Sequence, residues 1–477
     1  GIALSGLNLL GSLFIFIIGL IVIAAAIMFI LDVTQTRSAI RRNYPVIGRF
    51  RTLFSHLGEF FRQYFFALDR EEMPFNRAER QWVDHVCEDG SDVVPFGSTK
   101  NLTAGTPIFA NGLFPALDDD MPPKPDFIIG PNTRKPYQPG SLFNISAMSY
   151  GSLSKPAIQA LSRGAALSRC FLNTGEGGVS PYHLEGGCDV VYQLGTAKFG
   201  ARNENSTLNE DKLRKVCENP QIKMVEIKLS QGAKPGKGGI LPGTKVTAEI
   251  AAIRGIEEGV SALSPNRHVD AGNAEELLDL IHRVREVSGL PTGIKLCIGQ
   301  VGPVIDLLKA IKARGGQSAP DYIVVDGGDG GTGASPLPLI DNTGLTVRES
   351  LPLMDDLLKD YDLRDRVKLI ASGKLITSAD VAWAFCAGAD MVNNGRGFMF
   401  ALGCIQALKC DKNTCPTGIT THNPRLQRGL DPANKAVRVH NYVKNIVKEV
   451  EIIAHACGVD EPRELTREHL LIVQASG

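Results

Sequence analysis

The sequence lacks any excess of charge. Its 51 lysine and arginine residues balance 51 aspartate and glutamate residues, so the formal net charge is zero. Because nucleic acids attract proteins through a surplus of basic residues, the composition gives no electrostatic reason to expect a nucleic-acid partner. A disulfide framework is also missing, since the ten cysteines are scattered without the regular spacing of small secreted scaffolds. This cysteine usage favours a reducing compartment.

The first 31 residues lack charge altogether. The run Leu7–Leu31 is almost wholly apolar, and about 20 apolar residues suffice to cross a bilayer. A cleaved signal peptide would carry basic residues before a shorter apolar core, and nothing basic precedes this run. A buried core helix rarely continues this long without a polar face. We therefore predict a single transmembrane helix over residues 1–33.

Arginines follow the apolar run, namely Arg37, Arg41, Arg42, Arg49 and Arg51. By the positive-inside rule, they predict a single-pass protein of the inner (cytoplasmic) membrane, with the chain after the helix facing the cytoplasm. The stretch Phe50–Leu68 mixes aromatic with basic residues at a spacing that suits an amphipathic helix in the membrane interface. Docking of this stretch against the catalytic domain is an equally good interpretation.

Short β-rich segments alternate with helical patterns from about residue 142 onward. Such alternation implies parallel pairing, and eight strands over about 250 residues suit an α/β fold of the (β/α)8 TIM-barrel type. An open doubly wound sheet is the alternative. The predicted strands are Phe143–Ala147, Cys170–Asn173, Met224–Lys228, Val260–Leu263, Gly293–Leu296, Tyr322–Val325, Val367–Ala371 and Met391–Asn394. Predicted helices between them include Lys155–Arg169, Ala274–Val287, Val301–Arg314 and Ala379–Ala387.

This pattern divides the chain into four parts. After the transmembrane helix, residues 34–140 are expected to form a juxtamembrane and irregular lead-in segment, in which no long periodic helix is visible. Residues 141–430 are expected to form the barrel, and residues 431–477 a C-terminal helical extension.

Polar or glycine-rich residues follow every predicted strand. In TIM barrels the active site is built from the carboxyl ends of the strands and the loops after them. The last two predicted strands lead into Gly373 and into the sequence Gly395-Arg396-Gly397. Bare backbone N–H groups at this place often bind phosphate. These glycines, with Arg396 as a charged contact, therefore predict a phosphate-bearing cofactor.

Three cysteines lie close together after the last predicted strand. Cys404, Cys410 and Cys415 have C-x5-C-x4-C spacing, and Pro416 follows the last of them. Closely spaced cysteines ending in Cys-Pro are typical of iron–sulfur ligation, and three ligands suit a three-iron cluster or a four-iron cluster with one open site. Buried structural cysteines are the alternative, but a polar, turn-rich segment is a poor place for apolar filler. A phosphate site beside such a cluster favours flavin mononucleotide (FMN).

Several long motifs in one order resemble the FMN-binding synthase domain of glutamate synthase. They are SAMSYGSLS, NTGEGG, EIKLSQGAKPGKGG, LPGTKV, DGGDGGTGAS, the last glycine-rich turn and the cysteine loop, and they span about Leu142 to Arg425. The resemblance implies a barrel that binds FMN and a 3Fe-4S cluster on the three cysteines. It further implies an electron-donor protein as partner and the reduction of 2-iminoglutarate, formed from 2-oxoglutarate and ammonia, to L-glutamate.

The resemblance also implies roles for individual residues. Met148 and Ser149 would line the flavin, and Lys295 would lie near its N1 side, where a cation stabilises the reduced form. Glu176, Gln231 and Lys234 would contact the 2-oxo acid or its imine. A dicarboxylate needs cations such as Lys234, and a carboxylate such as Glu176 can transfer protons.

The sequence also departs from the family. Glutamate synthases begin with a glutaminase domain and end with a large β-helix, and neither is recognisable here. Ammonia is therefore expected from solution, from a partner subunit or from an amine substrate. Lys237-Gly238-Gly239 stands where the family usually has an acidic residue and then glutamine.

Two alternative functions remain open. An FMN and iron–sulfur subunit could pass electrons within a membrane redox complex without making glutamate. A flavin barrel of the 2-hydroxy-acid oxidase type would use a histidine and arginine pair, for which only Arg267 and His268 are candidates.

Overall fold

The structure is a computed structural model that describes residues 2–35, 38–90, 93–117 and 126–474. Arg37 of the predicted basic flank therefore lies outside the described residues. The chain divides into two compact units, with the boundary between Glu79 and Arg80.

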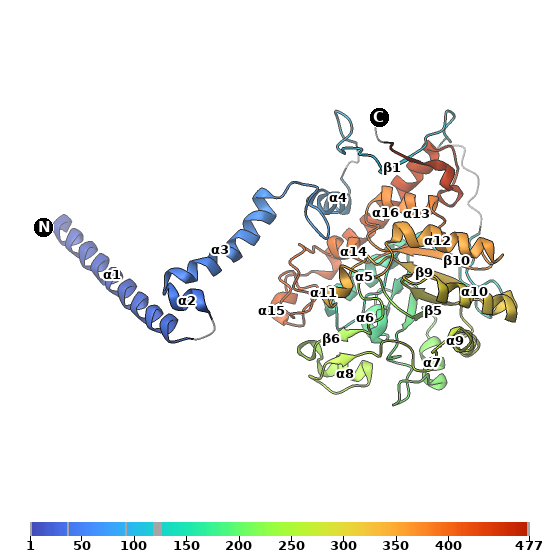
Figure 1. Ribbon diagram of the computed structural model, residues 1–477, viewed down its shortest axis with the longest axis horizontal. Coiled ribbons are helices and arrows are strands. Elements are labelled where there is room, and N and C mark those ends of the chain that lie inside the picture. The colour runs from blue at the N-terminus through green and yellow to red at the C-terminus, as the bar shows by residue number, and fades with distance from the viewer. Residues whose placement is uncertain (1, 36–37, 91–92, 118–125, 475–477) are drawn as a thin grey trace. The chain divides into compact units, whose positions relative to one another are not determined.

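The first unit consists of helices. Helix α1 spans Ile2–Thr34, and its part Leu9–Thr34 is long and apolar enough to cross a membrane, judged by length and composition. Helices α2 (Ala39–Asn43) and α3 (Ile47–Phe61) follow, and a π-helical turn (Arg62–Phe66) extends α3. Figure 1 shows α1 and α3 meeting at α2. The predicted helix in the aromatic stretch is thus present.

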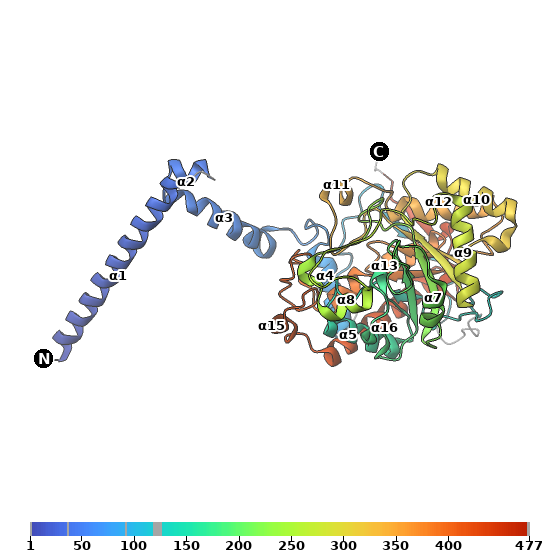
Figure 2. The same cartoon turned by 90° about the horizontal axis from the view of Figure 1, so that it is seen from below.

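The second unit is built around eight parallel strands that close into a barrel, as predicted. Their order around the barrel is β10-β11-β2-β3-β4-β5-β8-β9. The strands are β2 (Phe143–Ile145), β3 (Leu172–Asn173), β4 (Val190–Leu194), β5 (Ile222–Lys228), β8 (Thr292–Leu296), β9 (Tyr322–Asp326), β10 (Lys368–Ser372) and β11 (Met391–Asn394). Helices surround the strands in both views (Figures 1 and 2).

One predicted barrel strand is wrong and one barrel strand was missed. Instead of Val260–Leu263, only Ala262–Leu263 (β7) is a strand, and it pairs antiparallel with β6 (Ile240–Leu241) outside the barrel. The missing barrel strand is β4, whose five residues are all buried. The segment between β3 and β4 contains a 3-10 turn (Gly175–Gly177) and the four-residue helix α6 (Pro181–Leu184), so the alternation of strand and helix is too weak there to reveal β4.

Capping residues fix the ends of the surrounding helices. Helix α5 (Lys155–Ser168) begins where the Ser154 hydroxyl accepts a hydrogen bond from the Ala157 N–H, and it ends at Arg169 in the left-handed region. The other helices are α7 (Glu210–Cys217), α8 (Ala248–Arg254), α9 (Ala274–Ser288), α10 (Gly302–Arg314), α11 (Leu337–Ile340), α12 (Val347–Asp360), α13 (Ser378–Cys386), α14 (Arg396–Ala401), α15 (Pro424–Gln427) and α16 (Pro432–Ala456).

Regular structure also occurs where the sequence predicted an irregular lead-in. Helix α4 (Arg77–Cys87) is 11 residues long, and strand β1 (Pro107–Phe109) pairs antiparallel with β12 (Leu470–Ile472). From Arg80 onward the lead-in belongs to the barrel unit, because Asn445 on α16 donates a hydrogen bond to the Val86 carbonyl. The buried side chains of Val83, Val86 and Cys87 stabilise α4 by packing. The helix is too short to show a long periodic pattern in the sequence.

The amino ends of the barrel strands are closed by apolar side chains. Ile129 and Tyr137, which pair with each other through two backbone hydrogen bonds, pack in a buried cluster with residues at the starts of the strands. That cluster contains Met224 of β5, Tyr322 of β9 and Met391 of β11. Ligands therefore have access to the barrel interior from the carboxyl ends of the strands.

Candidate functional site

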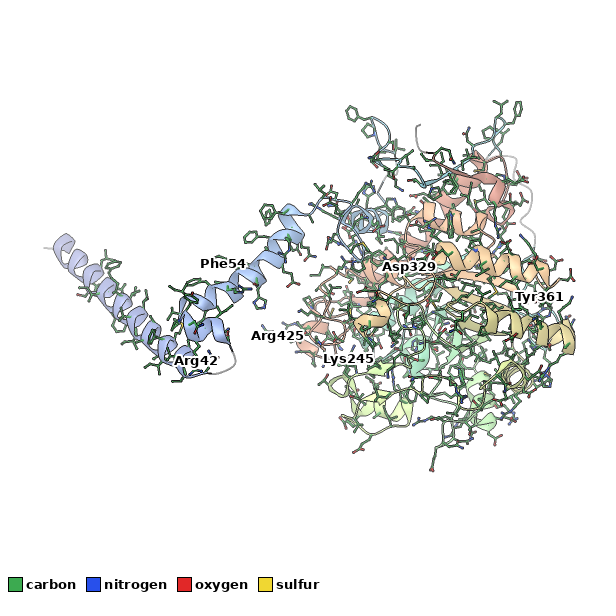
Figure 3. The ribbon with its side chains drawn as sticks, viewed as in Figure 1. Arg42, Phe54, Lys245, Asp329, Tyr361 and Arg425 are labelled. Atoms are coloured by element: carbon green, nitrogen blue, oxygen red, sulfur yellow. The ribbon has the colours of Figure 1, made fainter. Side chains whose placement is uncertain are left out.

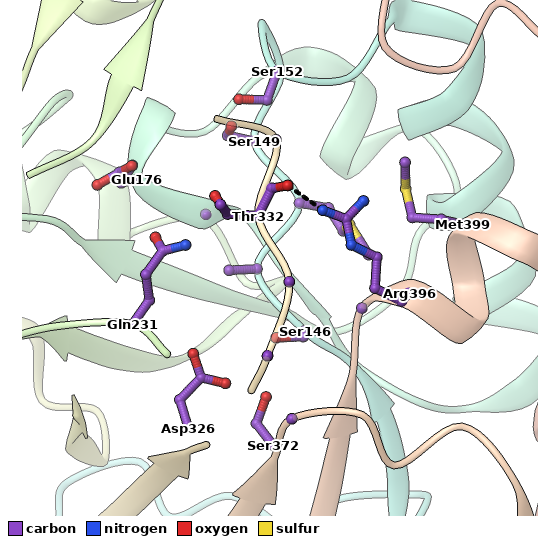
Figure 4. A pocket seen from close by; sticks show the side chains of 18 of the residues that line it. Ser146, Ser149, Ser152, Glu176, Gln231, Asp326, Thr332, Ser372, Arg396 and Met399 are labelled. Atoms are coloured by element: carbon purple, nitrogen blue, oxygen red, sulfur yellow. Dashed lines mark hydrogen bonds between the residues drawn. The ribbon is translucent and has the colours of Figure 1, made fainter. Parts of the chain in front are cut away.

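A cavity lies at the carboxyl ends of the barrel strands and collects the residues that follow them (Figure 4). It is lined by all the predicted site residues of the barrel except Gly397, namely Met148, Ser149, Glu176, Gln231, Lys234, Lys295, Gly373, Gly395 and Arg396. In Figure 4, Glu176, Gln231 and Asp326 lie on one side of the view, and Arg396 and Met399 lie on the other.

A lysine and carboxylate network forms one side of the cavity. Lys228 Nζ lies 3.2 Å from Glu176 Oε2 and donates a hydrogen bond of 2.5 Å to Gln231 Oε1. Burial acts to raise the pKa of Glu176, but the charges of Lys228, Lys234 and Arg254 outweigh it and the pKa is lowered. Glu176 is therefore an anion held among cations.

Lys234 is almost fully buried beside this network. Its ammonium group donates a hydrogen bond of 3.1 Å to the Ala334 carbonyl. Burial lowers the pKa of Lys234 to about 8, although Glu176 opposes the shift. With no carboxylate bonded directly to it in the described structure, Lys234 can offer its charge to an anionic ligand.

A second charged group lies deeper in the barrel. Lys295 Nζ is 3.5 Å from Asp326 Oδ2, and the same carboxylate oxygen accepts a hydrogen bond from the Gly232 N–H. Burial acts to lower the pKa of Lys295, but Asp326 and Glu226 outweigh it and the pKa is raised. Lys295 therefore remains a cation at the floor of the cavity.

The opposite side of the cavity is glycine-rich and fits a phosphate-bearing flavin. The Arg396 guanidinium donates a hydrogen bond to the Thr332 carbonyl and lies against Gly331, where a Cβ atom would be 2.4 Å from Arg396 Nε. At Gly395, which lines the cavity, a Cβ atom would make only ordinary van der Waals contact, 3.8 Å from Met148 Cε, so its backbone is accessible from the cavity space. Backbone groups, a guanidinium and open space together provide what a phosphate group requires.

Gly397, a predicted phosphate contact, is not among the residues that line the cavity. A Cβ atom at Gly397 would lie 2.0 Å from the Tyr442 hydroxyl oxygen. Tyr442 is a buried residue of α16 whose hydroxyl donates a hydrogen bond to the Ile376 carbonyl. Glycine at this position allows α14 to pack against α16.

The three predicted cluster ligands lie on the loop after α14. Cys404 and Cys410 are half-buried, Cys415 is buried, and all three are free thiols. Burial acts to raise the pKa of Cys415, but its hydrogen bonds, including one with the Thr417 hydroxyl at 3.4 Å, outweigh burial and the pKa is lowered. Among the described residues, no three cysteine, histidine or acidic side chains are grouped around a point that could hold a single metal ion. The donor chemistry of the three cysteines fits thiolate ligation of a cluster.

One buried lysine, Lys245, connects the cysteine loop to the cavity through hydrogen bonds. Lys245 Nζ donates hydrogen bonds to the Ser152 carbonyl and, at 3.3 Å, to the Cys410 carbonyl. Asn413 donates a further bond of 2.9 Å to the Thr244 carbonyl. Since Ser152 lines the cavity, Lys245 connects the cysteine loop directly to the cavity wall.

The sequence analysis assigned no individual role to Lys228, Arg254 or Asp326, although Asp326 begins the polar, glycine-rich run after a predicted strand. Lys228 and Asp326 line the cavity, and Arg254 is buried, with Nη2 donating a hydrogen bond to the Tyr150 carbonyl. A signal for Lys228 was present, because Glu226 and Lys228 alternate with apolar residues in a buried strand. Charged residues at that spacing point to the barrel interior.

His268 lies outside the cavity lining, although the sequence suggested it as part of a catalytic pair. Its Nε2 is 2.9 Å from the Lys228 carbonyl oxygen, and burial lowers its pKa to about 4. The ring is therefore neutral and holds the end of β5. Arg267 donates a hydrogen bond to the His268 carbonyl. This arrangement gives no support to the 2-hydroxy-acid oxidase alternative.

The fold and the cavity define a (β/α)8-barrel enzyme whose site at the strand carboxyl ends is prepared for anionic groups. The family pattern described as "Conserved region in glutamate synthase" matches residues 117–460. The chain belongs to the glutamate synthase family and is a glutamate synthase-like oxidoreductase.

Individual relatives support this assignment. The glutamate synthase large subunit-like protein YerD of Bacillus subtilis is 38% identical over 98% of this chain and 96% of its own length. The archaeal glutamate synthase [NADPH] of Methanocaldococcus jannaschii is 36% identical over 67% of this chain, which matches only 60% of that relative. The flavin-binding domain of baker's yeast flavocytochrome b2 aligns over 76% of each chain with a TM-score of 0.47 and 16% identity. That likeness is too distant to add to the assignment.

Proposed function

We propose that this chain is a membrane-anchored FMN and iron–sulfur oxidoreductase that reduces a 2-imino acid to an amino acid. The substrate is 2-iminoglutarate, formed from 2-oxoglutarate and ammonia or an amine, and the product is L-glutamate. The observation that carries the proposal is the grouping of Glu176, Lys228 and Lys234 on one side of a cavity whose other side is rich in glycine.

The lysine and carboxylate network suits a dicarboxylate with a reactive carbon between its polar groups. Lys228 and Lys234 supply cations for carboxylates, and Gln231 supplies a hydrogen-bond donor beside them. Glu176 carries a negative charge close to both lysines. It would hold ammonia or an iminium group and would exchange a proton with the nitrogen.

FMN, when bound, supplies the hydride that the imine carbon receives. Met148 and Ser149 would line the flavin, and Lys295 would neutralise charge that develops near it. Gly373, Gly395 and Arg396 would hold its phosphate. Cys404, Cys410 and Cys415 would hold the 3Fe-4S cluster through which electrons from a donor protein enter.

Residues 9–34 would anchor the enzyme in the inner membrane, with the barrel on the cytoplasmic side. The predicted domain boundaries at residues 33, 140 and 430 belong to this proposal.

The proposal is tested by anaerobic spectroscopy of the detergent-purified chain. We expect flavin absorbance, a low-temperature EPR signal from the oxidised cluster, and reoxidation of the dithionite-reduced protein by 2-oxoglutarate with ammonium, with glutamate appearing in step. Glu176→Gln is expected to slow reoxidation by about 10²- to 10⁴-fold, the usual contribution of a proton-transfer group, while both cofactors stay bound. Lys237→Met, which changes an exposed lysine of the same loop, is the matched control.

Two results would contradict the proposal. Both cofactors without reoxidation by any amine would favour an electron-transfer subunit. Equal reoxidation rates in the Glu176→Gln and Lys237→Met variants would show that Glu176 takes no part in the reaction.

A further inference from the structure

The segment after α1 presents an apolar face that the other described residues of its own compact unit leave exposed. Phe50, Phe54 and Phe61 on α3 are between 43% and 65% exposed, and Phe65 and Phe66 in the π-helical turn are 67% and 75% exposed. The apolar residues recur at positions 50, 53, 54, 57, 60, 61 and 64, which places them on one face of the helix. Figure 3 shows Phe54 on α3.

The same segment is strongly basic. Residues 38–66 contain five arginines, namely Arg41, Arg42, Arg49, Arg51 and Arg62, and one acidic residue, Glu59. An aromatic face combined with arginines is the composition of helices that lie in the headgroup region of anionic membranes. A soluble protein partner would match the apolar face but would not require this surplus of positive charge.

An ion pair between the buried Asp32 and the partly exposed Arg49 joins α3 to the end of α1. Arg49 Nε and Nη2 each donate a hydrogen bond of 2.8 Å to the Asp32 carboxylate, and the Val46 N–H donates a third bond to it. Asp32 is 1% exposed, so loss of Arg49 would leave a buried charge without its partner. The pair, which we call the elbow, fixes the start of α3 directly beside the end of the apolar run.

We propose that α3 and its π-helical turn lie on the anionic surface of the same membrane that α1 crosses, and that the elbow holds them there. The proposal rests on the proposed membrane anchor. The chain leaves the bilayer at Thr34, and α3 begins 13 residues later at Ile47. The bilayer surface is therefore the first surface that its aromatic face meets. If the test excludes the membrane surface, docking of α3 on the barrel or on a second copy of the chain replaces this proposal.

Tryptophan quenching in full-length protein tests the proposal. The chain is reconstituted in nanodiscs that contain phosphatidylcholine and phosphatidylglycerol, with bromine at shallow or deep positions of the acyl chains. Tryptophan replaces Phe54 on the aromatic face, Ser55 on the opposite face, or Phe16 within α1. The parent protein, with Trp82 and Trp383, supplies the background signal.

We expect the Phe54→Trp signal to be blue-shifted and quenched by shallow bromine, with the Ser55→Trp signal left largely unquenched. The Phe16→Trp signal should be quenched by deep bromine. Equal, weak quenching at positions 54 and 55 together with strong quenching at position 16 would overturn the surface proposal and leave the anchor intact. Absence of quenching at position 16 would instead overturn the anchor.

Two further arms separate the parts of the proposal. Omitting phosphatidylglycerol should reduce quenching at position 54, because the arginines then lose their anionic partners. Unchanged quenching would show that charge does not hold the helix. Adding Asp32→Asn should reduce quenching at position 54 and leave position 16 unchanged, and a constant signal at position 54 would overturn the role of the elbow.

Discussion

Lys234 combines deep burial with a pKa close to neutral. Burial lowers that pKa to about 8 from an ordinary value of 10.5. The group is therefore a cation below about pH 8 and loses its charge as the pH rises further. A bound dicarboxylate needs the cation, so substrate affinity and this ionisation are coupled.

We expect the affinity for 2-oxoglutarate to fall as the pH rises through about 8. The dissociation constant is measured from the change in flavin absorbance without ammonium, which avoids the ionisation of ammonia itself. Lys234→Met should weaken binding at neutral pH by about 10- to 100-fold, the contribution of a hydrogen bond to a charged group, and should abolish the pH dependence. Lys237→Met should behave as the parent, and a parent affinity that is constant across this pH range would contradict the assignment.

At the scale of elements, the turn from β11 into α14 places two glycines in different surroundings. Gly395 adjoins open space in the cavity, and Gly397 faces Tyr442 on α16. Adding a methyl group at Gly395 therefore tests the cavity, and adding one at Gly397 tests the packing of α14 against α16.

We expect Gly395→Ala to keep its stability and lose affinity for FMN, because the new methyl group occupies cavity space. Gly397→Ala should lower the free energy of unfolding by about 1–3 kcal/mol, as overpacking of a close contact does. Thermal unfolding and flavin release by ultrafiltration separate the two effects. Adding Tyr442→Phe should recover part of the loss in Gly397→Ala, and a purely additive double variant would exclude the contact as its cause.

The sequence predicted seven of the eight barrel strands because each is a short apolar run next to a helical pattern or a glycine-rich turn. Strand β4 escaped because α6, the helix before it, has only four residues. The segment at Val260–Leu263 misled because its composition is that of a strand, and composition does not say which sheet a strand joins.

The candidate site was predicted through motifs, and its charge network was not. Glu176 and Lys234 stood out in glycine-rich loops. Lys228 and Asp326 are the last residues of β5 and β9. In the sequence they look like ordinary polar residues at the ends of strands. Their pairing depends on which strands are neighbours around the barrel, and a single sequence does not contain that information.

At the scale of the whole molecule, the apolar helix α1 and the barrel belong to separate compact units. We expect the full chain to remain in the membrane fraction after an alkaline carbonate wash and to require detergent for release. The retained protein should still carry residues 9–34, which mass spectrometry of its N-terminal peptide checks. Release by carbonate, or loss of these residues, would favour a peripheral protein or a cleaved signal sequence.

The hydrogen bonds of Lys245 also join parts of the chain that are far apart in the sequence. This one lysine binds the carbonyls of Ser152, which precedes it, and of Cys410, which follows it. Ser152 follows the first barrel strand, β2, and Cys410 follows the last, β11, and these two strands pair where the barrel closes. Under the proposed function, we therefore expect a cluster to be inserted into a folded barrel, because the cysteine loop has this support only when both ends of the barrel are in place.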